Sequence, residues 1–357
     1  MSEMNPMQGR DFGSRHLSIE LTNICNLHCS YCGRDDDALY HSPATFLSTE
    51  FLERIVVEAQ ESMGITRLSF TGGETTLHPQ FDRILDIAEA NDLQVSFITN
   101  GWHFDRVWPS ILSHPKTVSS VGFSFDGTTR ETHDKWRGDG SFVRLIKAVA
   151  RCYARDIPFA IKVVIRRDTL PHLEQIALFA ARMGATSLNF SHLLQTSLEI
   201  ENSSGLSFEE RARAEQEIAN LAHIFKMKIR IDVGYYNIDV SPPCSALAGV
   251  SANIDYRGRL TLCCNLSGFR GAVREDDVVA DLNQEHFATA FARLSRLAAD
   301  QVEARRGHLQ MLADQGRTPD LSSGSPCMFC LNTLGKVPWR QSSVMASTFS
   351  RTLPVLS

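Results

Sequence analysis

Hydrophobic and polar positions follow two alternating patterns through the first half of the chain. Short runs rich in β-branched and aromatic residues are typical of buried strands, and the segments between them repeat apolar residues at helical spacing. Phe51, Leu52 and Ile55 show that helical spacing, and Gly184 is a predicted helix end. The predicted strands are 16–21, 67–71, 93–99, 120–125, 159–165 and 186–193, and the other predicted helices here are 79–91, 104–113, 141–155 and 171–183.

The order of these elements predicts a topology. Strand–helix units in series indicate parallel strands joined by right-handed crossovers. Six units are too few for a complete eight-unit barrel. We therefore predict an α/β fold that begins with a partial (β/α)6 TIM-like barrel over 16–195. Ligands of such sheets bind at the carboxyl ends of the strands, so residues just after each strand are expected to carry the chemistry.

The pattern changes after residue 193. A polar loop, a helix from about 207 to 225 and a strand at 228–233 form a predicted connecting region, 196–235. Residues 251–263 predict a hairpin that turns at Arg257-Gly258, and a long helix is expected over about 285–313. These features predict a small α+β subdomain at 236–340. Residues 1–15 and 341–357 are expected to be a flexible N-terminus and a C-terminal tail.

Composition narrows the class of protein. The chain has 357 residues, 43% of them hydrophobic, and a net charge of -5, which gives no support for nucleic-acid binding. No stretch approaches the ~20 apolar residues of a membrane span, and the N-terminus has no apolar core like that of a signal peptide. We therefore expect a cytoplasmic protein, in which the nine cysteines are metal ligands or catalytic thiols rather than disulfides.

The densest cysteine cluster lies directly after the first predicted strand. Cys25, Cys29 and Cys32 are spaced C-x3-C-x2-C. Thiolates suit iron–sulfur clusters or zinc, and three of them leave one iron of a four-iron cluster without a protein ligand. Such an open position is where a substrate or cofactor binds. A zinc knuckle with a distant fourth ligand, or three unrelated buried cysteines, are the alternatives.

The segment "IELTNICNLHCSYC" resembles the signature of the radical S-adenosylmethionine (SAM) superfamily. The resemblance implies a 4Fe–4S cluster on the three cysteines, with its open iron chelated by the amino and carboxylate groups of SAM. It further implies reductive cleavage of SAM to a 5′-deoxyadenosyl radical that abstracts hydrogen from the substrate. Tyr31 matches the aromatic residue that family members place near the adenine.

Further matches to the family follow the next three strands. Gly72, Gly73 and Glu74 resemble the family's Gly-Gly-Glu motif, which binds the SAM amino group, although Gly-Gly after a strand is often only a turn. Asn100 occupies another matching position, again with a strand-ending turn as the alternative. By the same resemblance, two further residues hold the SAM carboxylate. They are Ser124 and Arg137.

Four other polar residues follow the later strands without a clear match. Asp126 is expected to cap its loop or to bind substrate, with the structural role favoured. Lys162 and Arg166 belong to the fifth strand region, and Arg166 is a candidate contact of SAM or of an acidic substrate. His192 follows the sixth strand. Each of the last three is more often a surface charge or a satisfied polar residue.

A second cysteine set lies in the C-terminal part. Cys244, Gly258 and Cys263 fit the C-x(9–15)-G-x4-C element of the SPASM/twitch extension, and Cys327 and Cys330 add a C-x2-C pair. The resemblance implies one auxiliary iron–sulfur cluster on the four cysteines, with a structural zinc site as the alternative. Cys264 is an alternative ligand to Cys263, and it stands where some peptide-oxidising relatives carry an Asp base. Lys336 and Arg340 replace later SPASM cysteines, and Cys152 fits a buried core thiol.

The expected activity follows from this resemblance. The barrel begins at residue 16, which leaves no room for the N-terminal peptide-binding domain of many peptide-modifying relatives. The first hypothesis is therefore oxidation or rearrangement of a small natural-product metabolite, such as a sugar, aminocyclitol or nucleoside. A peptide-modifying enzyme that forms a cross-link or an epimerised residue is the alternative, and a zinc-stabilised binding protein is a third. Expected partners are the substrate and an electron donor such as flavodoxin or ferredoxin.

Overall fold

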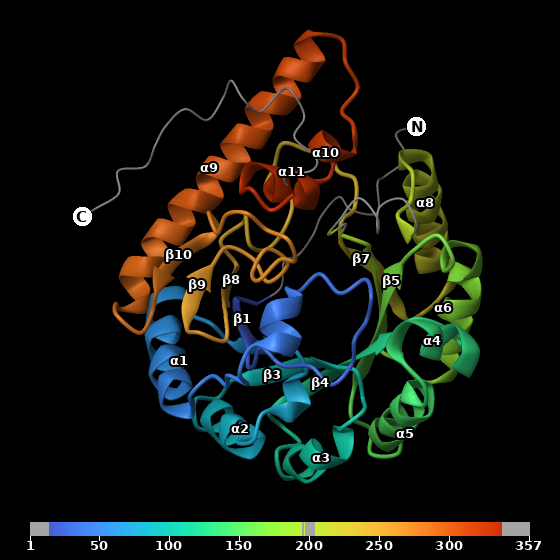
Figure 1. Cartoon of the computed structure of the whole chain (residues 1–357), viewed down its shortest axis with the longest axis vertical. Helices are drawn as coiled ribbons and strands as arrows, with labels where there is room; N and C mark the ends of the chain where they lie inside the picture. Colours follow the sequence, from blue (N-terminus) through green and yellow to red (C-terminus); the bar gives the residue numbers. More distant parts are fainter. Residues whose placement is uncertain (1–13, 195, 197–203, 338–357) are drawn as a thin grey trace.

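The computed structural model describes residues 14–194, 196 and 204–337 (Figure 1). Most of the expected flexible N-terminus, most of the polar loop, the C-terminal tail and Arg340 lie outside the described residues. No helix among the described residues is long and apolar enough to cross a membrane.

The first half alternates strands and helices as predicted. The strands are β1 (His16–Glu20), β2 (Arg67–Thr71), β3 (Gln94–Thr99), β4 (Val118–Phe125), β5 (Phe159–Ile165) and β6 (Ser187–His192). The helices are α1 (Thr49–Met63), α2 (Phe81–Ala90), α3 (Phe104–Ser113), α4 (Arg130–Arg137), α5 (Ser141–Tyr153) and α6 (Leu173–Arg182), with short turns η1 (Asp37–His41), η2 (Thr75–Leu77) and η3 (Leu170–His172). All six strands are parallel, so the prediction of a partial parallel barrel is confirmed.

The sheet continues beyond the six predicted strands. Its order is β10-β9-β8-β1-β2-β3-β4-β5-β6-β7. At one edge, α8 (Phe208–Ile224) leads into β7 (Lys228–Val233), which pairs parallel with β6. At the other edge, β8 (Ser251–Ile254) pairs parallel with β1 and antiparallel with β9 (Arg259–Thr261). The last strand, β10 (Val278–Asp281), pairs antiparallel with β9. One sheet joins strands on both sides of residues 195 and 235, so the sheet does not mark a domain boundary at either position. The predicted boundaries there stay predictions.

The C-terminal part packs around this second edge. The predicted hairpin is present, and its turn includes Gly258, whose φ of +83° is the left-handed conformation that glycine adopts without strain. The long helix α9 (Phe287–Asp314) contacts α1, β9 and β10, and α10 (Leu321–Gly324) and α11 (Pro326–Thr333) follow it. Figure 1 shows α9 running past the α1 side of the barrel.

The two faces of the sheet differ in character. Leu17, Phe70, Phe97 and Phe123 belong to the buried core and are at most 1% exposed. The opposite, concave face carries small polar side chains. One row of serines is continuous in register across four strands (Ser18, Ser69, Ser96 and Ser120), and its members are only partly buried. A complete barrel fills its interior with bulky branched residues, whereas this row of small side chains leaves room for ligands.

Candidate functional site

The first cysteine cluster lies in the loop that leaves the carboxyl end of β1. Cys25, Cys29 and Cys32 are all free thiols, and a turn closes the loop where the Cys32 backbone N–H donates to the Cys29 carbonyl at 2.9 Å. Burial raises the pKa of the Cys25 thiol to about 12, and the Glu74 carboxylate adds to the rise. The three thiols act on one another electrostatically, so the structure brings the three together. Bound metal deprotonates such thiols.

The Gly-Gly-Glu loop packs directly against the cysteine loop. A Cβ atom on Gly73 would lie 1.9 Å from the Ile24 carbonyl oxygen, and one on Gly72 would lie 2.6 Å from the Thr22 carbonyl oxygen. The Gly73 and Glu74 N–H groups donate to those same oxygens, at 2.9 Å to Thr22 and 2.8 Å to Ile24. The two glycines thus let the Gly-Gly-Glu loop approach the backbone of the cysteine loop closely. This contact fixes the position of the cysteine loop over β1 and β2.

Glu74 joins this loop to the next strand. Its side chain is buried, and Oε1 accepts from Thr76 Oγ1 and Thr99 Oγ1, both at 2.6 Å, while Oε2 accepts from the Asn100 N–H at 2.8 Å. Burial raises the pKa of this carboxyl, and the hydroxyl donors oppose that rise. Oε2 accepts one bond from the described residues, which leaves it capacity for an external donor. Asn100 Nδ2 in turn lies 3.9 Å from Cys25 Sγ and donates to Asn26 Oδ1 at 3.0 Å.

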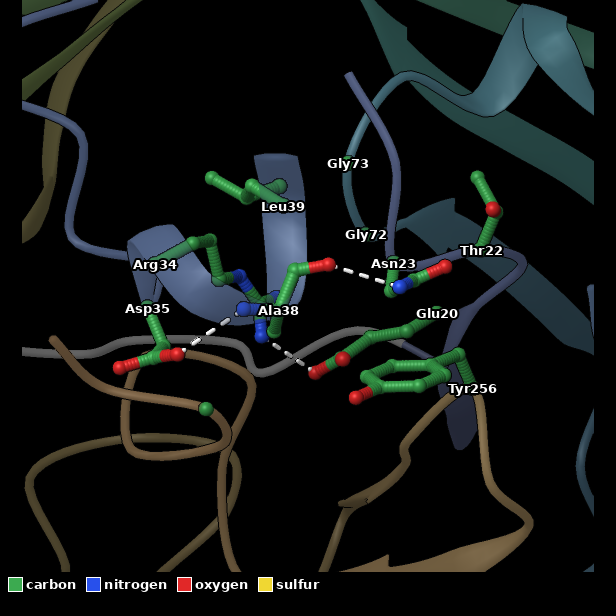
Figure 2. Close-up of a pocket in the computed structure, with 11 residues that line it drawn as sticks. Glu20, Thr22, Asn23, Arg34, Asp35, Ala38, Leu39, Gly72, Gly73 and Tyr256 are labelled. Atoms are coloured by element: carbon green, nitrogen blue, oxygen red, sulfur yellow. Dashed lines mark hydrogen bonds and ion pairs between the residues drawn. The ribbon is translucent and has the colours of Figure 1, made fainter. Parts of the chain in front are cut away.

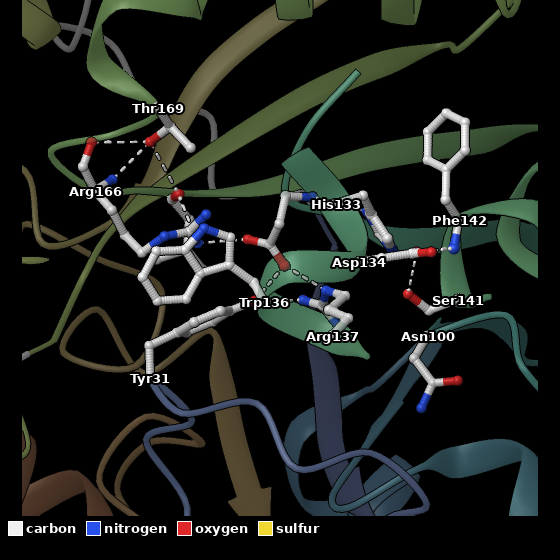
Figure 3. Close-up of polar contacts among 12 residues, drawn as sticks. Tyr31, Asn100, His133, Asp134, Trp136, Arg137, Ser141, Phe142, Arg166 and Thr169 are labelled. Carbon is white, nitrogen blue, oxygen red and sulfur yellow. Dashed lines mark hydrogen bonds and ion pairs between the residues drawn. The ribbon is translucent and has the colours of Figure 1, made fainter. Parts of the chain in front are cut away.

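A buried ion network lies at the carboxyl ends of β4 and β5 (Figure 3). The Asp126 carboxylate, 2% exposed, accepts from Tyr31 Oη, from Arg137 Nε and, at 2.5 Å, from Arg166 Nη1. Arg137 Nη2 also donates to Tyr31 Oη at 2.7 Å. Burial would raise the pKa of Asp126, but the two guanidinium groups outweigh it and hold the pKa below its usual value. The Asp126 side chain was expected to cap its loop, and the structure places it in an ion network instead. Its alternative role in binding substrate stays a prediction.

Sequence reasoning missed two members of this network. Trp136 packs its ring against the Arg166 guanidinium, with 4.2 Å from the guanidinium carbon to the ring centroid, and donates from Nε1 to Asp168 at 2.6 Å. Asp168 also accepts from Arg166 Nε at 3.3 Å. Neither residue belongs to a motif. The only sequence signal for them is that Trp136 directly precedes Arg137 and Asp168 follows Arg166 by two residues. Arg166 itself is fully buried rather than a surface charge.

The remaining candidates lie on β4, β5 and β6. Ser124 is in register with Lys162, and both are partly buried. Lys162 forms an ion pair with Asp232 of β7 at 3.0 Å. His192 is 1% exposed, and its Nε2 lies 3.0 Å from Glu215 Oε1. Lys162 and His192 therefore have partners within the chain.

A small pocket lies at the carboxyl end of β1, lined by residues of the N-terminal loops and by Tyr256 of the C-terminal hairpin (Figure 2). Glu20, Arg34, Gly73 and Tyr256 are among the residues that line it. Arg34 Nη1 donates to Glu20 Oε1 at 2.7 Å and to the Ser267 carbonyl at 2.7 Å, so it joins β1 to the segment after Cys264. Sequence reasoning did not select Glu20 or Arg34.

The second cysteine set converges in the C-terminal part. The Gly234 N–H donates to Cys327 Sγ at 3.3 Å. Burial raises the pKa of Cys330, and the thiols of Cys244 and Cys327 add to the rise. Cys263 is within electrostatic range of Cys244 and hydrogen-bonds to Cys264. The structure thus brings the four predicted ligands together.

Two further observations concern metals at this site. Among the described residues, no group of three or more His, Cys, Asp or Glu side chains is arranged to hold a single metal ion. The thiolates of an iron–sulfur cluster bind different irons, so this observation does not test a cluster. Cys264 has Ser18 as a hydrogen-bond partner and Arg34 as a nearby charge, and both belong to the barrel side.

A buried ion pair occupies the position where the sequence lacks a later SPASM cysteine. Lys336 Nζ lies 2.5 Å from Asp277 Oδ1, and the two side chains are 2% and 0% exposed. Burial raises the pKa of Asp277, and the Lys336 ammonium opposes the rise. The pair links the segment after α11 to the residue before β10, a connection within the protein that needs no metal.

This pair gives a stability prediction. Lys336→Ala is expected to lower the free energy of unfolding by about 3–5 kcal/mol, because it leaves the Asp277 carboxylate buried without its partner. The double variant Lys336→Met/Asp277→Leu should recover most of the loss. Anaerobic urea unfolding measures the stability of both variants. The control is Arg83→Ala, which breaks an exposed ion pair with Glu53 and should change the free energy of unfolding by less than about 1 kcal/mol. An equal, small effect of Lys336→Ala and Arg83→Ala would contradict the prediction.

Comparison with known proteins agrees with this geometry. Residues 19–180 match the profile of the radical SAM superfamily. Mycofactocin maturase MftC of Mycobacterium tuberculosis (strain CDC 1551 / Oshkosh) is 34% identical over 177 residues, which cover 48% of this chain and 42% of MftC. PqqA peptide cyclase of Gluconobacter oxydans (strain 621H) is 24% identical over 258 residues, 69% of each chain.

Solved structures share the fold. The structure of native anSMEcpe with bound AdoMet and Cp18Cys peptide has a TM-score of 0.62 at 18% sequence identity, covering 81% of this chain and 84% of that one. Its likeness to the present structure confirms the predicted fold class, a partial barrel followed by a smaller C-terminal part. The chain spans about two fifths of the length of the MftC relative. The similarity to the radical SAM superfamily thus lies in residues 19–180, just under half of the chain.

Proposed function

We propose that this protein is a radical SAM enzyme that modifies a peptide. The observation that carries the reaction type is the meeting of Cys25, Cys29 and Cys32 with the Gly-Gly-Glu loop at the carboxyl ends of β1 and β2. Three thiols and no fourth fit a 4Fe–4S cluster with one open iron. A cluster held by these cysteines would supply the electron for reductive cleavage of SAM, chemistry that provides for hydrogen abstraction from the substrate.

The residues around the cysteine loop fit the groups of SAM. Glu74 Oε2, with its spare acceptor capacity, would hold the amino group. Arg137 uses Nε and Nη2 within the chain, so Nη1 is left for the carboxylate, and Ser124 is the second proposed donor to it. Tyr31 would lie against the adenine, and Asn100 would hold the loop near Cys25.

A second, auxiliary cluster is proposed at Cys244, Cys263, Cys327 and Cys330. Its support is the convergence of the four thiols and the Gly234 N–H at Cys327, since backbone donors to sulfur are typical of cluster sites. We propose Cys263 rather than Cys264 as the ligand, because the contacts of Cys264 with Ser18 and Arg34 are to the barrel side.

A peptide is favoured over a small metabolite as the substrate. The relatives are a maturase and a peptide cyclase, and a structural neighbour holds a peptide. The concave face also offers a continuous row of small side chains beneath the SAM region. The sequence argument for a sugar, aminocyclitol or nucleoside depended on where the barrel begins, and a separate peptide-binding partner defeats that argument.

The test of the reaction begins with anaerobic reconstitution. The protein is expected to bind about eight iron and eight sulfide per chain, the content of two 4Fe–4S clusters. With SAM and either dithionite or reduced flavodoxin, it should form 5′-deoxyadenosine. Zinc without acid-labile sulfide would instead support the zinc-stabilised binding protein and reject the proposal.

The substrate class is tested separately. Short peptides encoded beside the gene are incubated with the reduced enzyme and SAM, and their masses are measured. A loss of two hydrogens indicates a cross-link. In D2O, uptake of one deuterium into a peptide of otherwise unchanged composition indicates epimerisation. Conversion of a sugar, aminocyclitol or nucleoside, with every such peptide unchanged, would reject the peptide assignment while leaving the radical SAM reaction standing.

Two neighbouring cysteines give a prediction about the auxiliary cluster. Cys263→Ala is expected to reduce the content to about four iron and four sulfide per chain, since it removes a ligand of one cluster. Cys264→Ala should retain both clusters. Iron and sulfide analysis with the visible absorbance spectrum measures the difference, and the reverse pattern would assign Cys264 as the ligand.

A further inference from the structure

The buried part of the network around Asp126 holds two guanidinium groups and one carboxylate. Arg137 and Arg166 are 11% and 0% exposed at their side chains, and both pair with the single carboxylate of Asp126. Burying a guanidinium is costly unless an opposite charge and hydrogen bonds compensate it. Two buried cations share one buried carboxylate, and the other carboxylate of the network, Asp168, is partly exposed.

Arg166 has only weak compensation outside Asp126. Asp168, its second carboxylate, lies 3.3 Å from Nε and is 36% exposed, and it is also shared with Lys135 at 3.5 Å. Among the described residues, Arg166 Nη2 is buried without a hydrogen-bond partner. An orphaned buried donor of this kind calls for an explanation other than fold stability.

The position of Arg166 suggests that explanation. Its guanidinium contacts two aromatic rings, 4.2 Å from the Trp136 centroid and 4.7 Å from the Tyr31 centroid, and the two rings pack edge-to-face against each other. Tyr31 is two residues beyond Cys29, and its hydroxyl is held by Asp126 and Arg137. Arg166 therefore fixes the ring of Tyr31 directly and its hydroxyl through Asp126.

The same charges act on the cysteine loop. Arg166 lies 4.7 Å from the ring centroid of Tyr31, which directly precedes Cys32, and Arg137 donates to the hydroxyl of the same tyrosine at 2.7 Å. Both cations therefore lie beside the cysteine loop. A cluster on the three thiolates gains one negative charge when it is reduced, and nearby cations favour that state.

We propose that Arg166 is a positioning residue for the cluster and SAM, an inference that rests on the proposed function. It holds Tyr31 and Arg137 in place through Asp126, and its buried positive charge makes the cluster easier to reduce. The two effects are separable, because the charge can be kept while the planar fork of the guanidinium is lost.

Three variants test the proposal on the reconstituted enzyme. Arg166→Met removes the charge and should disfavour reduction of the SAM-site cluster by about tenfold, a shift of ~59 mV to more negative potential for one electron. Arg166→Lys should keep the wild-type potential and weaken SAM binding several-fold, because the bridge between Tyr31 and Asp126 is loosened. Asp168→Asn removes a negative charge and should shift the potential in the opposite, positive direction.

The measurements do not depend on turnover. EPR-monitored redox titration gives the potential of the cluster whose spectrum changes on addition of SAM, and equilibrium dialysis gives the SAM dissociation constant. Should Arg166→Met fail to fold, Asp168→Asn and Arg166→Lys still decide the outcome. Potentials and SAM affinities equal to wild type in the folded variants would overturn the proposal. A wild-type protein that assembles no cluster would instead reject the proposed function.

Discussion

Cys29→Ala is expected to lower the formation of 5′-deoxyadenosine by more than about a hundredfold. Removing a residue that only supports a metal ligand already lowers metal affinity or activity by about 10–100-fold, and Cys29 is a proposed ligand itself. Cys29 is the middle thiol of the loop, and the turn to Cys32 begins at its carbonyl. The remaining two thiols cannot retain a cluster. Chromatographic assay of 5′-deoxyadenosine after anaerobic incubation with SAM and dithionite measures the loss.

The matched control is another cysteine. Cys152 is fully buried in α5 and belongs to the hydrophobic core, so Cys152→Ala should leave iron content and 5′-deoxyadenosine formation unchanged and lower stability modestly. If Cys29→Ala kept wild-type formation of 5′-deoxyadenosine, the assignment of the first cysteine cluster would be wrong.

Gly73→Ala is expected to lower the free energy of unfolding by about 3 kcal/mol or more and to impair cluster assembly. The new Cβ would lie 1.9 Å from the Ile24 carbonyl oxygen. This steric clash is with a backbone atom, so a change of side-chain rotamer cannot relieve it. Overpacking of this kind typically costs 1–3 kcal/mol when side chains give way. Because Ile24 precedes Cys25, the displaced backbone also moves the first ligand.

Gly307 provides the contrast. It lies in α9 with nothing within 4 Å of an added Cβ. Gly307→Ala should raise stability by up to about 1 kcal/mol, the difference in helix propensity between the two residues. Urea unfolding and the iron content of both variants give the comparison. A Gly73→Ala protein as stable and as rich in iron as wild type would show that the loop yields easily.

Local patterns predicted the elements of this fold well. Strands β2 and β5 begin and end where the apolar runs do, and α3 coincides with its predicted range, because each of these patterns depends on neighbouring residues alone. The pairing of β8 with β1 was not predicted. That pairing joins residues more than 200 positions apart, and nothing in the alternation of 251–254 identifies its partner strand.

The site was predictable only where it follows a motif. The cysteine spacing and the Gly-Gly-Glu sequence identified the loops, and the structure brings those loops together. Glu74 was expected to serve a ligand, and its hydrogen bonds to Thr99 and Asn100 were not foreseen. Arg166 was ranked low because the burial of a charged residue cannot be recognised from its type, and its contacts with the rings of Tyr31 and Trp136 join three separate segments.

The place of β1 in the sheet affects how the chain can fold during synthesis. One edge of β1 pairs with β2. The other edge pairs with β8 (Ser251–Ile254), which is synthesised much later. While residues 72–250 leave the ribosome, that second edge exposes unpaired N–H and C=O groups, a known template for association with other chains. The strand that carries the cysteine loop is thus completed late. Coexpression with a chaperone that shields nascent strands is expected to improve the soluble yield.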